Sequence, residues 1–281
     1  MEVNGMLKLG IRDKFGNIKK GINDYEEEKH SLESMGENFC YIASQDFVYE
    51  DGDEIEVFVE KKNQFLMVKL DESMDSTIVF IPDHFWKYKI KMEQTSKEAI
   101  PDNRFTNKRH YLYVRNATNE EINRYQNWAL NPHDQKDFLG AFPHASANVE
   151  TRNDATFFAC NAINGIHANN SHGSYPYQSW GINQQSDATL TIDFGRPVEV
   201  DKVSITIRAD FPHDSYWTEV TMLFSDESSE TFRLQKTKNP QSFVFKKRTV
   251  TYVQLTKLVK ANDVSPFPAL TELEVYGLNK I

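Results

Sequence analysis

The chain has 281 residues, with 32 basic and 41 acidic side chains, a net charge of −9 and two cysteines. The acidic balance argues against a general nucleic-acid binder, because neutralising phosphates requires a surplus of Lys and Arg. Cys40 and Cys160 are too few and too far apart for a disulfide framework or a cysteine zinc site. No window approaches the run of about 20 apolar residues that spans a membrane, and the N-terminal residues lack the features of a secretory signal. We therefore expect a soluble, cytoplasmic protein that binds neither nucleic acid nor membrane.

The first part of the chain alternates apolar and polar residues, which is typical of β-strands with one buried face. In Asp53–Glu60, the apolar residues Ile55, Val57 and Val59 occupy every second position. Three more β-rich runs follow between turn-forming residues, at 65–68, 77–81 and 110–114. The pattern predicts an antiparallel β-sandwich over residues 1–116.

Charge is unevenly distributed along the chain. Residues 21–60 hold 13 acidic side chains and one basic one, Lys29, whereas residues 233–260 hold eight basic side chains and no acidic one. Two solvated faces would explain this pattern. The alternative is that the two patches meet, either between domains or between subunits.

A helix is predicted between two β-rich regions. Thr118-Asn119-Glu120-Glu121 has the spacing of a capping box. Ile122, Tyr125 and Ala129 then recur on one helical face, and Pro132 ends the run. We expect a helix near residues 118–130, within a connector that covers residues 117–136.

The region after the connector changes character. Residues 131–185 contain four of the eight histidines, eight asparagines and little strand pattern. A long irregular stretch in a compact domain usually indicates functional loops. Alternation resumes at Leu190, and at least six strands follow. The prediction is an all-β chain of two antiparallel, jelly-roll-like sandwich domains joined by a short helix, the second domain covering residues 137–281.

The second domain resembles a known superfamily. Phe158–Gly165 resembles the Ala-x-Asp-Gly opening loop of galactose-binding-like β-sandwiches, which include discoidin and coagulation-factor C domains and bacterial carbohydrate-binding modules. Trp180, Leu190–Val200 and Leu273–Gly277 match further elements in order, so the resemblance covers residues 137–278. The whole chain is also similar to bacterial carbohydrate-binding proteins, at 142–148, 179–183 and 208–214. The resemblance is specific for the fold and weak for function, because this fold has many ligands.

The resemblance also implies a structural calcium site. Members of the superfamily often hold the ion where the opening loop meets the closing strand, which makes Asn164 and Glu272 the side-chain ligands here. Backbone carbonyls of residues 165–170 would complete a shell of six to eight oxygens. Asn164 replaces the family's Asp and removes one negative charge. A metal-free loop held by hydrogen bonds is the alternative.

One loop candidate for ligand binding is residues 208–217, which contain Arg208, His213, Asp214 and Trp217. Sugar recognition requires planar donors and acceptors for hydroxyl groups, and an aromatic face for the apolar side of the ring. Arg208, Asp214 and His213 supply the first and Trp217 the second. Alternatively, Arg208 and Asp214 form an ion pair that stabilises the loop, and Trp217 is a core anchor.

A second loop candidate is residues 172–180. Tyr175 and Trp180 would offer aromatic faces to the ligand, and His172 would lie at the rim of the site. In the fold that this domain resembles, loops at one end of the sandwich converge, so the two loops could line one pocket. The alternative is a Trp–Tyr plug that closes the sandwich.

The favoured function is non-catalytic recognition of a carbohydrate or sugar-like small molecule by loops at one end of the second sandwich. One alternative is an enzyme acting on a small polar or sugar substrate, with His213 and Asp214 as an acid–base pair. A metal centre would combine Asp214 with the histidines at 144, 167, 172 and 213. Another alternative is a structural or protein-interaction subunit. The first domain could be a scaffold, a homodimerisation surface or a second binding module.

Overall fold

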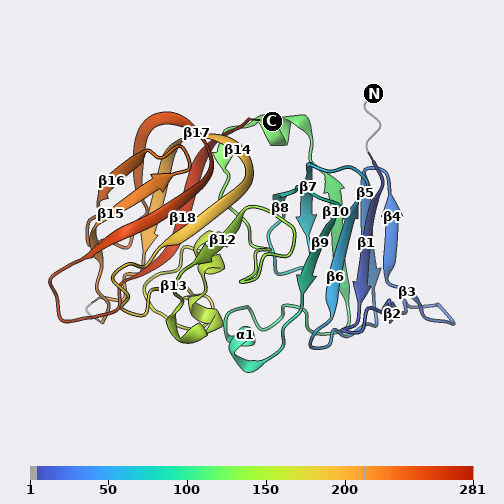
Figure 1. Ribbon diagram of the computed structural model, residues 1–281. Coiled ribbons are helices and arrows are strands. Elements are labelled where there is room, and N and C mark those ends of the chain that lie inside the picture. The colour runs from blue at the N-terminus through green and yellow to red at the C-terminus, as the bar shows by residue number, and fades with distance from the viewer. Residues whose placement is uncertain (1–4, 212, 281) are drawn as a thin grey trace. The chain divides into compact units, whose positions relative to one another are not determined.

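The computed structural model describes residues 5–211 and 213–280 (Figure 1). The chain divides into two compact units. Unit 1 comprises Met1–Glu121 and Asp137–Ala141, and unit 2 comprises Ile122–Lys136 and Phe142–Ile281. These ranges differ from the expected domains at the connector, because residues 122–136 belong to unit 2 and residues 137–141 to unit 1.

Unit 1 is a sandwich of two four-stranded antiparallel sheets whose inward side chains form one hydrophobic core. The alternation noted in the sequence is confirmed in β6, where Ile55, Val57 and Val59 are fully buried. A short pair of strands, β2 (Lys20–Gly21) and β3 (His30–Ser31), and the helix α1 (Gln94–Glu98) lie outside these sheets. In spatial order, the strands of the first sheet are β4 (Glu33–Gly36), β1 (Leu7–Arg12), β6 (Glu54–Val59) and β9 (Phe85–Lys89). Those of the second sheet are β5 (Phe39–Ser44), β10 (His110–Asn116), β7 (Gln64–Lys69) and β8 (Thr77–Ile81).

Unit 2 is built on an eight-stranded antiparallel sheet in which β14 is central. Its register with β17 shifts between Asp193 and Val198 and again between Val200 and Lys202. Such irregularities bend a strand, so that one long strand contributes to both layers of a sandwich. The strands are β11 (Gln126–Asn127), β12 (His144–Ala147), β13 (Trp180–Gly181), β14 (Leu190–Ile207), β15 (Trp217–Phe224), β16 (Ser229–Arg233), β17 (Gln241–Lys260) and β18 (Ala269–Asn279). The expected all-β class is confirmed.

The predicted helix is much shorter than expected. The capping box is present, because Thr118 N donates to Glu121 Oε2 over 2.8 Å and Glu121 N donates to Thr118 Oγ1 over 3.3 Å. However, α2 covers only Asn119–Asn123, and none of its five residues is buried. The chain then becomes β11 and pairs with β18. The prediction of a helix to residue 130 is wrong, because strand pairing replaces the helical hydrogen bonds there.

The Asn- and His-rich stretch is irregular, as expected, and contains three 3₁₀ helices. They are η1 (Thr151–Asn153), η2 (Ala155–Phe157) and η3 (Ala159–Ile163). Asp154 caps η2, since its Oδ1 accepts hydrogen bonds from the amide and the hydroxyl of Thr156 at 3.0 and 2.8 Å. In the part of the chain that the structure describes, no helix has the length and apolar character needed to cross a membrane.

Candidate functional site

A cavity of about 420 Å³ opens in unit 2 where five segments of the chain meet. The loops that carry His172 and His213 both contribute to its wall, so these two segments do converge as the sequence suggested. The wall consists of residues from 151–157, 172–173, 181–184, 208–214 and 267–269. Pro212, within the second loop, lies outside the described residues.

The wall of this cavity contains a buried ion pair between Arg208 and Asp214. Arg208 directly follows β14, and its amide donates to Ala269 O over 2.9 Å. Its Nη2 donates to both Asp214 Oδ1 and the carbonyl oxygen of Phe267. Each of the two charged residues is only 4% exposed. The loop-stabilising ion pair that was one alternative is therefore present.

Two polar atoms of this pair keep unused hydrogen-bonding capacity. Arg208 Nε and Asp214 Oδ2 are buried, and neither forms a hydrogen bond with any described residue. Burial raises the pKa of the Asp214 carboxyl group, and the Arg208 guanidinium opposes this shift. An N–H donor and a carboxylate acceptor thus lack a partner on two residues that line the cavity, a combination that suits a hydroxyl-bearing ligand.

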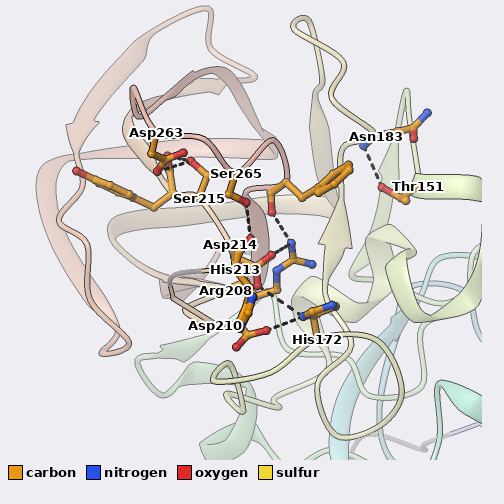
Figure 2. Close-up of polar contacts among 12 residues, drawn as sticks. Thr151, His172, Asn183, Arg208, Asp210, His213, Asp214, Ser215, Asp263 and Ser265 are labelled. Carbon is orange, nitrogen blue, oxygen red and sulfur yellow. Dashed lines mark hydrogen bonds and ion pairs between the residues drawn. The ribbon is translucent and has the colours of Figure 1, made fainter.

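His172 stands at the edge of the same cluster, with its side chain about half exposed. Its Nδ1 donates to Asp210 Oδ2 over 2.7 Å and lies 3.7 Å from Asp214 Oδ2 (Figure 2). Asp214 N in turn donates to Asp210 O over 3.0 Å, which closes the loop on itself. These contacts hold His172 over the acidic end of the ion pair.

His213 is exposed and lines the cavity. The loop behind it is fastened to the segment before β18. Ser265 Oγ donates to His213 O, and Ser215 Oγ donates to Asp263 Oδ2 over 2.9 Å (Figure 2). Among the described residues, the Asp214 carboxylate pairs with Arg208 and His172 and not with the side chain of His213, so the geometry gives no support to a His213–Asp214 acid–base pair.

The two tryptophans expected to face a ligand lie in the core instead. Trp180 in β13 and Trp217 in β15 are both fully buried, with ring centroids 6.4 Å apart. Trp180 Nε1 donates to Val149 O over 3.0 Å. The prediction that these rings contact ligand is wrong, because they fill the interior of the sandwich as its largest side chains. Tyr175 is 40% exposed but is not among the described residues that line the cavity.

The ring that does line the cavity and reach solvent is Phe267, which is 46% exposed. Sequence reasoning missed it. The available signal was its position between Pro266 and Pro268, where a large apolar residue lies outside any alternating pattern. Its backbone carbonyl oxygen accepts a hydrogen bond from Arg208 Nη2, so the residue that carries the aromatic ring also positions the guanidinium group.

The proposed four-histidine metal centre is not assembled among the described residues. His144 lies 2.8 Å from Asp134, and His167 lies 3.3 Å from Thr206. Ligand atoms of His172, Asp210 and Asp214 do lie within 4.8 Å of one another. The Arg208 cation occupies the other oxygen of Asp214 and opposes the binding of a metal ion there.

The expected calcium ligands lie next to each other, and their chemistry fits a hard cation. Glu272 is fully buried, and no cation is among the described groups that influence it. Its two oxygens accept hydrogen bonds from Gly165 N at 3.1 and 3.2 Å, and Asn164 Oδ1 accepts one from Ile166 N at 2.9 Å. Burial raises the pKa of Glu272 well above its usual value. A buried carboxylate beside an amide oxygen suits calcium, but the same hydrogen bonds would support a metal-free loop.

The calcium assignment predicts a difference in thermal stability. Calcium that binds only the folded protein stabilises it by mass action. Differential scanning calorimetry should therefore give a higher Tm in calcium than in chelator, with a smaller effect of magnesium. Glu272→Gln should remove this difference. Equal melting curves of the wild type in calcium and in chelator would establish the metal-free loop.

No protein-family model and no curated protein matches the sequence. Solved structures similar to it include chitosan-binding module 1 of a Paenibacillus sp. IK-5 chitosanase/glucanase (22% identity, 54% of this chain, 98% of that chain, TM-score 0.38). A second is the galactose-bound family 32 carbohydrate-binding module of Clostridium perfringens NanJ (18% identity, 47% of this chain, 91% of that chain, TM-score 0.36). A third is the Streptococcus pneumoniae fucose-binding module SpX-3 (18% identity, 54% of this chain, 98% of that chain, TM-score 0.38).

Proposed function

We propose that unit 2 recognises a carbohydrate or sugar-like small molecule, without catalysis, in the cavity beside Arg208 and Asp214. The observation that carries this proposal is the pair of buried polar atoms, Arg208 Nε and Asp214 Oδ2, that form no hydrogen bond with any described residue. Leaving such a group unpaired costs about 1–3 kcal/mol. A ligand that displaces the groups covering these atoms and satisfies both regains that free energy on binding.

Neighbouring hydroxyl groups of a sugar match these two atoms. A hydroxyl oxygen can accept from the Nε–H group of Arg208, while a hydroxyl hydrogen is donated to Asp214 Oδ2. Both protein groups are already fixed, because Asp214 and the carbonyl of Phe267 hold the guanidinium. Fixed groups lose little conformational entropy on binding, which favours affinity.

The remaining requirements of a sugar site are met at the rim of the cavity. Phe267 offers a partly exposed ring for the apolar C–H face of a pyranose. His172 and His213 add polar groups from two different loops. A volume of about 420 Å³ lies within the usual range of small-molecule pockets, roughly 300–1,000 Å³. A monosaccharide or a short oligosaccharide end is the ligand class that this arrangement suits.

The proposal predicts that the ring of Phe267 contributes to sugar binding. A saccharide array should identify a ligand, and isothermal titration calorimetry should then give its Kd. Phe267→Ala should weaken binding about tenfold, because it removes the exposed aromatic face. Tyr175→Ala is the matched control, since Tyr175 is similarly exposed but does not line the cavity, and it should bind like the wild type. If no saccharide binds, or if both variants bind equally, the proposed site is wrong.

The proposal also predicts that acid weakens binding. The raised pKa of Asp214 means that its carboxylate takes up a proton at a higher pH than an ordinary Asp, whose pKa is about 3.9. Protonation removes the acceptor at Oδ2 and the negative partner of Arg208. Affinity should therefore be full near neutral pH and decline as the pH falls through this raised pKa. Titrations across this range are compared with Asp214→Asn, in which the decline should be absent. An identical decline in that variant would contradict the assigned role.

A further inference from the structure

Four aromatic side chains form a continuous patch on the outer face of unit 1, which we call the aromatic platform. They are Phe39 and Tyr41 of β5 and Tyr111 and Tyr113 of β10. Phe39, Tyr41 and Tyr111 are 45%, 51% and 43% exposed, and Tyr113 is partly exposed. The intervening residues of both strands are buried in the core. The rings therefore project from the solvent side of the sheet.

The register of the two strands brings these rings together. β5 and β10 are hydrogen-bonded neighbours (Figure 1), and Tyr113 lies directly opposite Tyr41. Successive ring centroids are 5.8 Å (Phe39–Tyr41), 6.0 Å (Tyr41–Tyr111), 6.0 Å (Tyr111–Tyr113) and 5.9 Å (Tyr113–Phe39) apart. The four rings thus form a closed, nearly equal-sided arrangement.

The platform is held in place by its own strands and by one loop. Tyr113 Oη donates to Ser76 Oγ over 2.9 Å, and Tyr111 N donates to Glu72 Oε1. Tyrosine rings have few rotatable bonds, so they present a large contact area at little cost in conformational entropy. A ligand would meet a surface that is already ordered.

The composition of this face is unusual for a solvated sheet. Antiparallel sheets that face water on one side carry polar residues there. The outer face of the other sheet is mixed, because Arg12 pairs with Glu56 and Lys87 pairs with Glu54 and Glu56 there. Exposed Phe85 and Met35 also lie in this sheet. Contiguous exposed aromatic surface is a common sign of a binding site. The β5/β10 face differs in that its four rings are contiguous, and this continuous aromatic surface points to a ligand for the platform.

We propose that the aromatic platform binds an uncharged polysaccharide chain. Pyranose rings stack their apolar C–H faces on aromatic rings, and the tyrosine hydroxyls at the platform edges can hydrogen-bond to sugar hydroxyls. The four rings carry no charge. At the edges, Lys69 lies opposite Tyr113 and Arg115 lies opposite Phe39, while Glu72 accepts from Tyr111 N and Glu121 is ion-paired with Arg115, so the edge charges balance. Such a surface matches a neutral polymer with alternating apolar and hydroxyl-bearing faces.

Charge and area argue against the two other ligands that could stack there. A nucleic acid needs a surplus of basic side chains to neutralise its phosphates, whereas the chain has a net charge of −9 and Arg115, which lies opposite Phe39, is already ion-paired with Glu121. A second copy of the chain needs an interface of about 800 Å² on each partner. The exposed parts of the four rings amount to roughly 300 Å², given about 150–250 Å² for each complete ring.

The test is affinity electrophoresis of the full chain in native gels that contain hydroxyethylcellulose, a galactomannan or a soluble β-1,3-glucan. At least one polysaccharide should retard the wild type. Tyr41→Ala/Tyr111→Ala should weaken that binding at least about tenfold. Tyr111→Phe keeps the ring and should bind within about twofold of the wild type. Phe85→Ala, an exposed aromatic residue on the other sheet, is the matched control and should behave as the wild type.

Several outcomes would overturn the proposal. They are the absence of retardation by all three polysaccharides, equal losses in the Tyr41→Ala/Tyr111→Ala and Phe85→Ala variants, and tighter binding of a poly-dT oligonucleotide than of any polysaccharide. A change of oligomeric state on Tyr41→Ala/Tyr111→Ala, seen by sedimentation, would assign the platform to self-association instead. The series is repeated with Phe267→Ala, so that failure of the platform and failure of the unit 2 pocket are distinguishable.

Discussion

The buried ion pair between Arg208 and Asp214 is the interaction on which the architecture of the unit 2 cavity depends. Removing two charged groups from water is expensive, and a close pair with further hydrogen bonds offsets that cost only in part. Here Arg208 Nη2 binds both Asp214 and the carbonyl of Phe267. One guanidinium group thereby links the end of β14, the loop that follows it and the segment before β18. Because the cost of burying the two charges is offset only in part, the main effect of the pair is to position the cavity wall.

Several other contacts depend on this arrangement. Asp214 places a carboxylate oxygen 3.7 Å from Nδ1 of His172, which in turn binds Asp210. Ser215 and Ser265 tie the same loop to the segment that carries Phe267. A charged pair, two histidines and one aromatic ring from separate parts of the chain therefore meet around one cavity. The platform on unit 1 follows another principle, since cross-strand register alone brings its four rings together.

Much of the fold could be predicted from the sequence, because strands with one buried face alternate visibly, as Ile55, Val57 and Val59 do. The helix near residue 120 was overestimated. Its capping box is real, but whether a chain continues as a helix depends on tertiary pairing, and here β18 offers β11 a partner. The loops at 172 and 208 were also found, because their Gly, Pro and polar residues differ from the strands around them.

Which aromatic residues face the ligand could not be predicted. Trp180 and Trp217 lie in or next to the loops that form the cavity, yet both fill the core, because burial depends on packing across the sandwich and not on residue type. Phe267 lies about 50 residues after the 208–217 loop and almost 90 after the 172–180 loop, so only the fold brings it to the cavity. The platform was hidden in the same way, since Phe39 and Tyr111 are far apart in the sequence and meet only through strand pairing.

The most direct test of the account is a nuclear magnetic resonance titration that follows the Nε–Hε signal of Arg208 while saccharide is added to the full chain. If this group donates to a sugar hydroxyl, its signal should shift in proportion to occupancy and its hydrogen should exchange more slowly with water. The Nε–Hε signal of Arg248, which donates to Lys246 O, serves as the internal reference and should not change. The titration uses the Tyr41→Ala/Tyr111→Ala chain, so that the platform does not contribute, and saturating binding of a saccharide to it with an unchanged Arg208 signal would contradict the central claim.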